Sequence, residues 1–94
     1  MESKTKKQKK SAQSLPKWFK GVQYAEGAEV TNPFSGQSYY LNEVELSLYD
    51  FIMGCNMVFE QYPDTLTKKR IDEFNKALSW FRKNNVEAYM VLLD

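Results

Sequence analysis

Histidine is absent from this chain of 94 residues, and cysteine occurs once, at Cys55. Without histidine, the chain has no Ser-His-Asp or Cys-His nucleophile system, no histidine-based acid–base step and no Cys/His zinc site. A single cysteine cannot form an internal disulfide. Hydrolases and zinc modules of the usual kinds are therefore excluded.

Long apolar runs are also missing. The basic start of the chain is not followed by the apolar stretch of a signal peptide. The most apolar stretch, residues 46–59, contains Asp50 and Asn56 and falls short of the roughly 20 residues that span a bilayer. The sequence therefore predicts an unexported, cytoplasmic protein without a transmembrane helix.

Residues that carry chemistry are sparse. The four glycines are scattered and form no phosphate-binding cluster, so nothing indicates a nucleotide or another cofactor. Neighbouring carboxylates, such as Glu43 and Glu45, point to different faces of a predicted helix, which favours a solvated surface over a metal site. Cys55 lies within an apolar stripe and is expected to be buried and unreactive. We expect no catalytic residue, no metal site and no enzymatic activity.

The chain does contain many apolar and aromatic residues, and its charged residues are unevenly distributed along the sequence. Hydrophobic residues make up 43% and aromatic residues 15% of the sequence, which is enough for one small folded core. Residues 1–20 hold seven of the 13 basic residues and a single acidic one, leaving six basic against eleven acidic residues thereafter. The chain is a basic tail on an acidic body.

Residues 1–14 contain no aromatic residue and only Met1 and Ala12 as apolar residues. Such a segment cannot bury enough surface to offset the entropy of ordering it. We therefore expect a disordered basic arm, dispensable for folding, followed by a single domain over residues 15–94. The arm is either a solvated tail or a contact for nucleic acid through its lysines: Lys4, Lys6, Lys7, Lys9 and Lys10.

The first part of the domain has the alternating pattern of strands. Residues 22–24 and 28–30 alternate apolar with polar side chains, and Glu26-Gly27 between them suits a hairpin turn with a positive φ at glycine. A second turn at residues 32–36 leads into the strand-like residues 37–41. These signals predict a three-stranded antiparallel meander at the N-terminal end of the domain.

A helix is predicted from Glu43 to residue 59 or 60, because Asn42 and Glu45 form a helix-start signature. Its apolar residues form two stripes. The first stripe consists of Val44, Leu48, Phe51, Cys55, Val58, Phe59 and Tyr62. The second, on the opposite side, consists of Leu46, Tyr49, Met53 and Met57. Either the helix is central within the domain, with residues 89–93 over the second stripe, or the second stripe is an interface.

A second helix is predicted over residues 68–84, after a break at residues 62–64 and with Asp64, Thr65 or Thr67 as its cap. Its buried stripe is Ile71, Phe74, Leu78 and Phe81. Trp80 points away from this stripe, as an exposed anchor or as a residue covered by the last segment. Asn84-Asn85 is expected to close the helix in a left-handed conformation.

Residues 86–93 are too short and too apolar for the period to separate strand from helix, although a short helix capped by Asn85 is favoured. The fold class is thus α+β: a small three-stranded meander packed on two α-helices, with a short C-terminal helical element.

Aromatic residues exceed what a domain of this size can bury, and Tyr and Trp dominate binding hot spots. The alternative is that most of them build an aromatic core. Two hypotheses follow: a non-enzymatic protein-interaction module, or a nucleic-acid-binding accessory protein that uses the lysine arm. The interface residues proposed for the module are Leu46, Tyr49, Met53, Met57 and Trp80.

Five segments together carry a resemblance to a known family: residues 16–21, 30–36, 45–54, 80–85 and 89–94. They resemble short proteins, without a known activity, that contractile-tailed phages of marine bacteria encode, cyanobacterial phages especially. The likeness covers nearly all of the predicted domain and leaves out the lysine arm. It implies a phage origin and the host cytoplasm and leaves the function open. It implies no site residues. For the interaction module, the expected partner is a host protein, a phage protein or a second copy of the chain.

Overall fold

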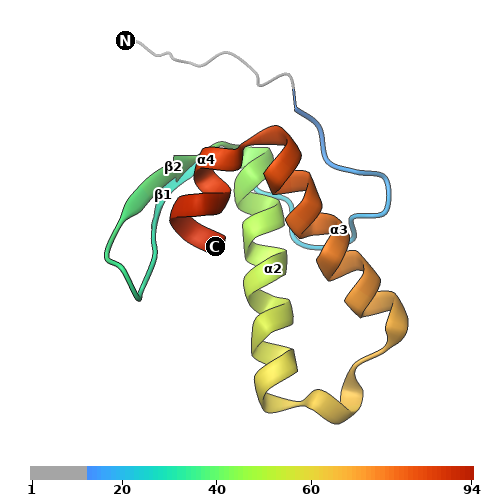
Figure 1. Cartoon of the computed structure of the whole chain (residues 1–94). Coiled ribbons are helices and arrows are strands. Elements are labelled where there is room, and N and C mark those ends of the chain that lie inside the picture. The colour runs from blue at the N-terminus through green and yellow to red at the C-terminus, as the bar shows by residue number, and fades with distance from the viewer. Residues whose placement is uncertain (1–12) are drawn as a thin grey trace, which may run out of the picture.

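The structure, a computed structural model, describes residues 13–94 and has an α+β fold (Figure 1). Two strands, β1 (Ala28–Thr31) and β2 (Ser38–Leu41), precede the long helix α2 (Glu43–Gln61). A short 3-10 turn, η1 (Pro63–Thr65), leads to α3 (Lys68–Asn84). The short helix α4 (Val86–Ala88) continues into a π-helical turn, η2 (Tyr89–Leu93).

The two strands pair antiparallel, with Ala28 opposite Leu41 and Thr31 opposite Ser38. The predicted turn between them is confirmed. The main-chain N–H of Phe34 donates to Asn32 Oδ1 over 2.8 Å, and Gly36 has a φ of +80°, which favours glycine. The turn projects from one side of the molecule (Figure 1).

The predicted third strand is wrong: residues 22–24 have no strand structure, and the sheet of the described residues has two strands. The main-chain N–H of Tyr24 donates to Ser47 Oγ of α2 over 2.9 Å, so it bonds to the helix and not to β1. The expected positive φ at Gly27 is also wrong. Gly27 is needed for another reason, because a Cβ there would overlap the carbonyl oxygen of Leu41.

Helix α2 begins at Glu43, as predicted, and ends at Gln61, one residue beyond the predicted end. Glu45 N donates to Asn42 Oδ1 over 2.8 Å, and Asn42 N donates to Glu45 Oε1 over 3.0 Å, completing a capping box. Along its first stripe Val44, Leu48 and Cys55 are buried, as expected. Tyr62 is 59% exposed, contrary to expectation, because it lies beyond the last turn of the helix. Ile52, which belongs to neither predicted stripe, is also buried.

Helix α3 has the predicted bounds, with Thr67 as its cap, and residues 86–93 are helical. Asn85 ends α3 and caps α4 by accepting from Ala88 N over 3.1 Å, but its φ of −156° is extended, so the left-handed conformation is not found. Ile71 is 40% exposed, contrary to prediction, because it lies in the first turn of α3 beyond the packed region. Ala77, not expected in the core, is buried.

The core surrounds α2. Helix α3 packs on one side of α2, and the hairpin and η2 lie on another (Figure 1). Its fully buried apolar residues come from β2, α2, α3 and α4: Leu41, Leu48, Ile52, Ala77, Phe81 and Ala88. Among the described residues, no helix has the length and apolar character needed to cross a membrane.

Candidate functional site

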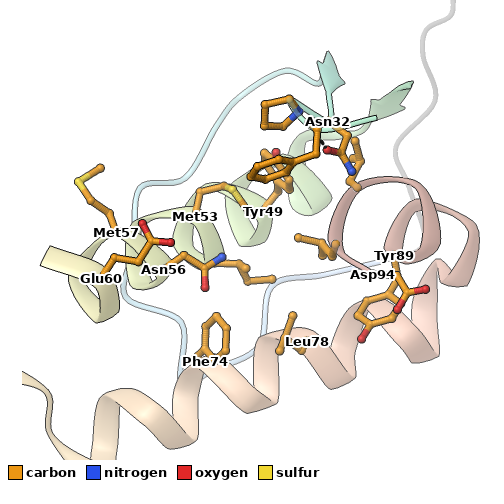
Figure 2. Close-up of a pocket in the computed structure, with 15 residues that line it drawn as sticks. Asn32, Tyr49, Met53, Asn56, Met57, Glu60, Phe74, Leu78, Tyr89 and Asp94 are labelled. Atoms are coloured by element: carbon orange, nitrogen blue, oxygen red, sulfur yellow. Dashed lines mark hydrogen bonds between the residues drawn. The ribbon is translucent and has the colours of Figure 1, made fainter. Parts of the chain in front are cut away.

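A groove of about 480 Å³ opens between α2, α3, the turn at residues 32–36 and η2 (Figure 2). Most of its lining residues are apolar, and Asn32, Asn56, Glu60, Tyr89 and Asp94 add polar groups. The apolar residues that line it are Pro33, Phe34, Tyr49, Ile52, Met53, Met57, Phe74, Leu78, Leu92 and Leu93. Four separate segments of the chain build this one surface.

Three of the four residues of the second stripe, Tyr49, Met53 and Met57, line the groove. Met57 is 54% exposed, whereas Tyr49 and Met53 are half-buried. Burial raises the pKa of the Tyr49 hydroxyl. Leu46, the fourth residue, is half-buried against the core and does not line the groove. The stripe is thus packed at its N-terminal end and open at its C-terminal end.

The C-terminal turn covers part of this stripe. Leu92 is 6% exposed and lines the groove together with Leu93. Asn32 Nδ2 donates to the carbonyl oxygen of Val91 over 3.0 Å, which ties the hairpin turn to η2. This hydrogen bond holds the turn and η2 together as one wall of the groove.

Phe34 stands at the rim of the groove and is 97% exposed. Its main chain is held by the Asn32 side chain, so the ring projects from an ordered turn. Phe34 is not among the interface residues predicted from the sequence. The signal was present in the Asn-Pro turn, because a large apolar residue at the tip of a tight turn has little core to pack against.

Polar groups mark the two ends of the groove. Figure 2 shows Asn56 and Glu60 on the α2 side, and Tyr89 and Asp94 at the opposite end. Within the described part of the chain, no lysine or arginine lines the groove, so its only charged groups are two carboxylates. An apolar side chain fits the centre of this surface, and a donor or a cation fits its ends.

Trp80, the fifth predicted interface residue, lies elsewhere. It is half-buried, contacts Phe81 in a T-shaped arrangement with 5.3 Å between ring centroids, and lines a separate shallow recess with Trp18. The recess places it beside Pro16 and Trp18 of the N-terminal segment. The structure thus divides the predicted interface residues between two surfaces. The lysines of the predicted arm, Lys4, Lys6, Lys7, Lys9 and Lys10, lie outside the described residues.

Cys55 is buried, at 2% exposure, as the sequence predicts. Burial raises the pKa of its thiol, and the Arg70 guanidinium of α3 opposes this effect in part. Arg70 lies on a different helix from Cys55, so the spacing of residues along α2 gives no sign of this contact. Within residues 13–94, no group of three or more His, Cys, Asp or Glu residues is placed to hold a metal ion.

Comparison of the chain with protein-family models, with curated proteins and with solved structures gives no match.

Proposed function

We propose that this chain is a non-enzymatic protein-interaction module, that the groove is its binding surface, and that a second copy of the chain occupies it. The observation that carries this proposal is the meeting of Tyr49, Met53 and Met57 in one apolar groove beside an almost fully exposed Phe34. The resemblance to phage proteins extends it to a phage accessory protein in the host cytoplasm, where a host or phage protein would be the alternative partner.

The chemistry of the groove supports a protein segment as its occupant. Methionine side chains are flexible and polarisable, so Met53 and Met57 adapt to an apolar ligand. The cavity of about 480 Å³ has room for an aromatic ring. Burial of a phenylalanine side chain contributes roughly 1.5–3 kcal/mol, and Phe34 has nearly its whole side chain available for such burial.

A second copy is favoured because the groove and the protruding Phe34 belong to one surface. In a two-fold dimer each copy presents the same patch, so Phe34 of one protomer inserts beside Met57 of its partner and the reverse. The contact is self-complementary and closes after two copies. Such a dimer buries both the groove and the Phe34 ring of each protomer.

Sedimentation equilibrium of the full chain over a range of concentrations tests this proposal. We expect reversible dimerisation that Met57→Glu and Phe34→Ser abolish, with helical content unchanged by circular dichroism. Met57 is suited to this change because it is 54% exposed in one chain, so the carboxylate is not buried in the monomer. Met53 is half-buried and is left intact.

Val86→Glu is the matched control, since Val86 is 55% exposed and does not line the groove. This variant should dimerise as the parent does. A parent that stays monomeric, or an equal loss of dimer in the Val86 variant, would contradict the proposal.

A second candidate function is nucleic-acid binding through the predicted lysine arm, favoured by the seven lysines among the first 20 residues. The dependence of binding on salt concentration distinguishes the two functions. Binding that depends on phosphate contacts weakens steeply as salt rises, whereas an apolar interface does not.

A further inference from the structure

A second recess, of about 390 Å³, lies on a face of α3 different from the one that lines the groove. We call it the tryptophan recess. It is lined by Pro16, Trp18, Asn75, Lys76, Trp80 and Lys83, together with Ser79 and Asn84. It brings both tryptophans of the chain to one site, although they are distant in the sequence.

Both indoles are held in place by packing. Trp18 contacts Phe19 and Phe51 in T-shaped arrangements, with 6.1 and 5.8 Å between ring centroids. Trp80 contacts Phe81 in the same manner. Each ring is half-buried, so part of its surface stays open to the recess. Little side-chain entropy is left to lose when a ligand stacks on these rings.

The recess carries positive charge, whereas the chain after residue 20 is acidic overall. Lys76 and Lys83 are exposed, and within the described residues neither pairs with a carboxylate. No acidic residue of the described chain lines the recess, although acidic residues outnumber basic ones eleven to six after residue 20. Positive charge here is therefore local, and suits an anionic ligand.

Two residues of the recess lie close in sequence to the most basic part of the chain. Pro16 and Trp18 form one wall of the recess, and Lys9 and Lys10 precede Pro16 by only a few residues. In Figure 1 the segment after residue 13 runs beside α3. A long anion bound in the recess is thus close in sequence to further lysines.

We propose that the tryptophan recess binds single-stranded nucleic acid. Its bases stack on Trp18 and Trp80, and its phosphates contact Lys76 and Lys83. Asn75, whose side chain has no hydrogen-bond partner among the described residues, supplies a donor and an acceptor for a base or a sugar. A duplex keeps its bases stacked on each other and cannot use the indoles in this way. This site is separate from the groove and does not depend on the proposed dimer.

The intrinsic fluorescence of the chain tests this proposal directly, because both tryptophans line the recess. Titration of the full chain with an oligothymidylate of about a dozen nucleotides should quench the tryptophan emission and saturate. A duplex of equal length should quench the emission far less. The apparent affinity should fall as salt rises, by about 0.7 in log K per unit of log salt for each phosphate contact.

Two double variants that reverse the charge of lysines on α3 identify where the nucleic acid binds. Lys76→Glu with Lys83→Glu should weaken binding at least tenfold. Lys68→Glu with Lys69→Glu changes the net charge equally on exposed positions outside the recess, and should have a much smaller effect. Trp80→Phe preserves an aromatic ring in the fold and should weaken binding by less than Trp80→Ala.

Three results would overturn the proposal. The first is no quenching of the full chain at low salt. The second is an equal effect of the two double variants on affinity. A large effect in both would assign the binding to overall charge, and no effect in either would assign it to the lysines of residues 1–14. The third is equal quenching by duplex and single strand, which would remove stacking on the indoles. Circular dichroism of each variant excludes loss of folding as the cause.

Discussion

The side-chain amide of Asn85 donates a hydrogen bond to Glu45 Oε2 over 2.8 Å and so joins the start of α2 to the junction of α3 and α4. Glu45 is 4% exposed. Its carboxylate also accepts from Gln13 Nε2 and from the main-chain N–H of Asn42, each over 3.0 Å. Three donors from three segments therefore satisfy one buried carboxylate, and the helices are fixed relative to each other at this end.

Removal of this carboxylate should destabilise the fold. Glu45→Ala leaves the donors of Asn42 and Asn85 without their acceptor, and we expect the free energy of unfolding to fall by about 2–3 kcal/mol. Urea denaturation followed by circular dichroism measures the change. Glu43→Ala, in the same turn of the helix, should cost less than about 1 kcal/mol. Equal losses in the two variants would show that the network contributes nothing of its own.

Gln13 gives the N-terminal segment a part in stability. Its side chain donates to Glu45 and accepts from Asn42 Nδ2 over 2.8 Å. We expect Gln13→Ala to lower the free energy of unfolding by about 1 kcal/mol. Ser14→Ala should leave it nearly unchanged. The sequence-based prediction that residues 1–14 are dispensable then applies to residues 1–12, whose deletion should leave the thermal midpoint as it is.

Cys55 should react slowly in the native protein, because its side chain is buried and its thiol pKa is raised. A thiol reagent should label it in the denatured chain and not in the folded one. Rapid stoichiometric labelling of the folded chain would contradict this prediction.

The raised pKa of Cys55 also predicts a pH dependence of stability. The folded chain holds the thiol proton more tightly than the unfolded chain, so this contribution is complete below the ordinary thiol pKa. It is lost as the pH rises through the raised value. Above about pH 9, the stability of the parent should therefore fall more steeply than that of Cys55→Ala. Parallel slopes would show that burial does not perturb the thiol.

Two glycines should respond in opposite directions to alanine. Gly54 lies within α2, and an added Cβ meets nothing within 4 Å, so Gly54→Ala should raise stability by roughly 0.5–1 kcal/mol. Gly27→Ala places a Cβ against the carbonyl oxygen of Leu41 and should lower stability strongly, because a main-chain atom must move. Thermal unfolding of the pair checks both signs. A neutral Gly27→Ala would show that the chain shifts there at little cost.

Local signals were enough to predict the helices. Asn42 and Glu45 satisfy each other's main-chain groups within one turn, so the start of α2 follows from the sequence alone. At the starts of α3 and α4, the side chains of Thr67 and Asn85 each accept from one main-chain N–H of the first turn. Strands need a partner elsewhere in the chain. Residues 22–24 have a strand-like pattern, but Ser47 of α2 takes the main-chain donor of Tyr24, and no third strand forms.

The candidate sites show the same division. The spacing of Tyr49, Met53 and Met57 places them on one face of α2, which the sequence determines. That this face opens into a groove depends on where η2 and the turn at Phe34 pack, and only the tertiary structure decides this. The pairing of Trp18 with Trp80 likewise depends on the path of the N-terminal segment along α3. Periodicity fixes which side chains share a face of one helix, whereas contacts between distant segments depend on the packing of the whole chain.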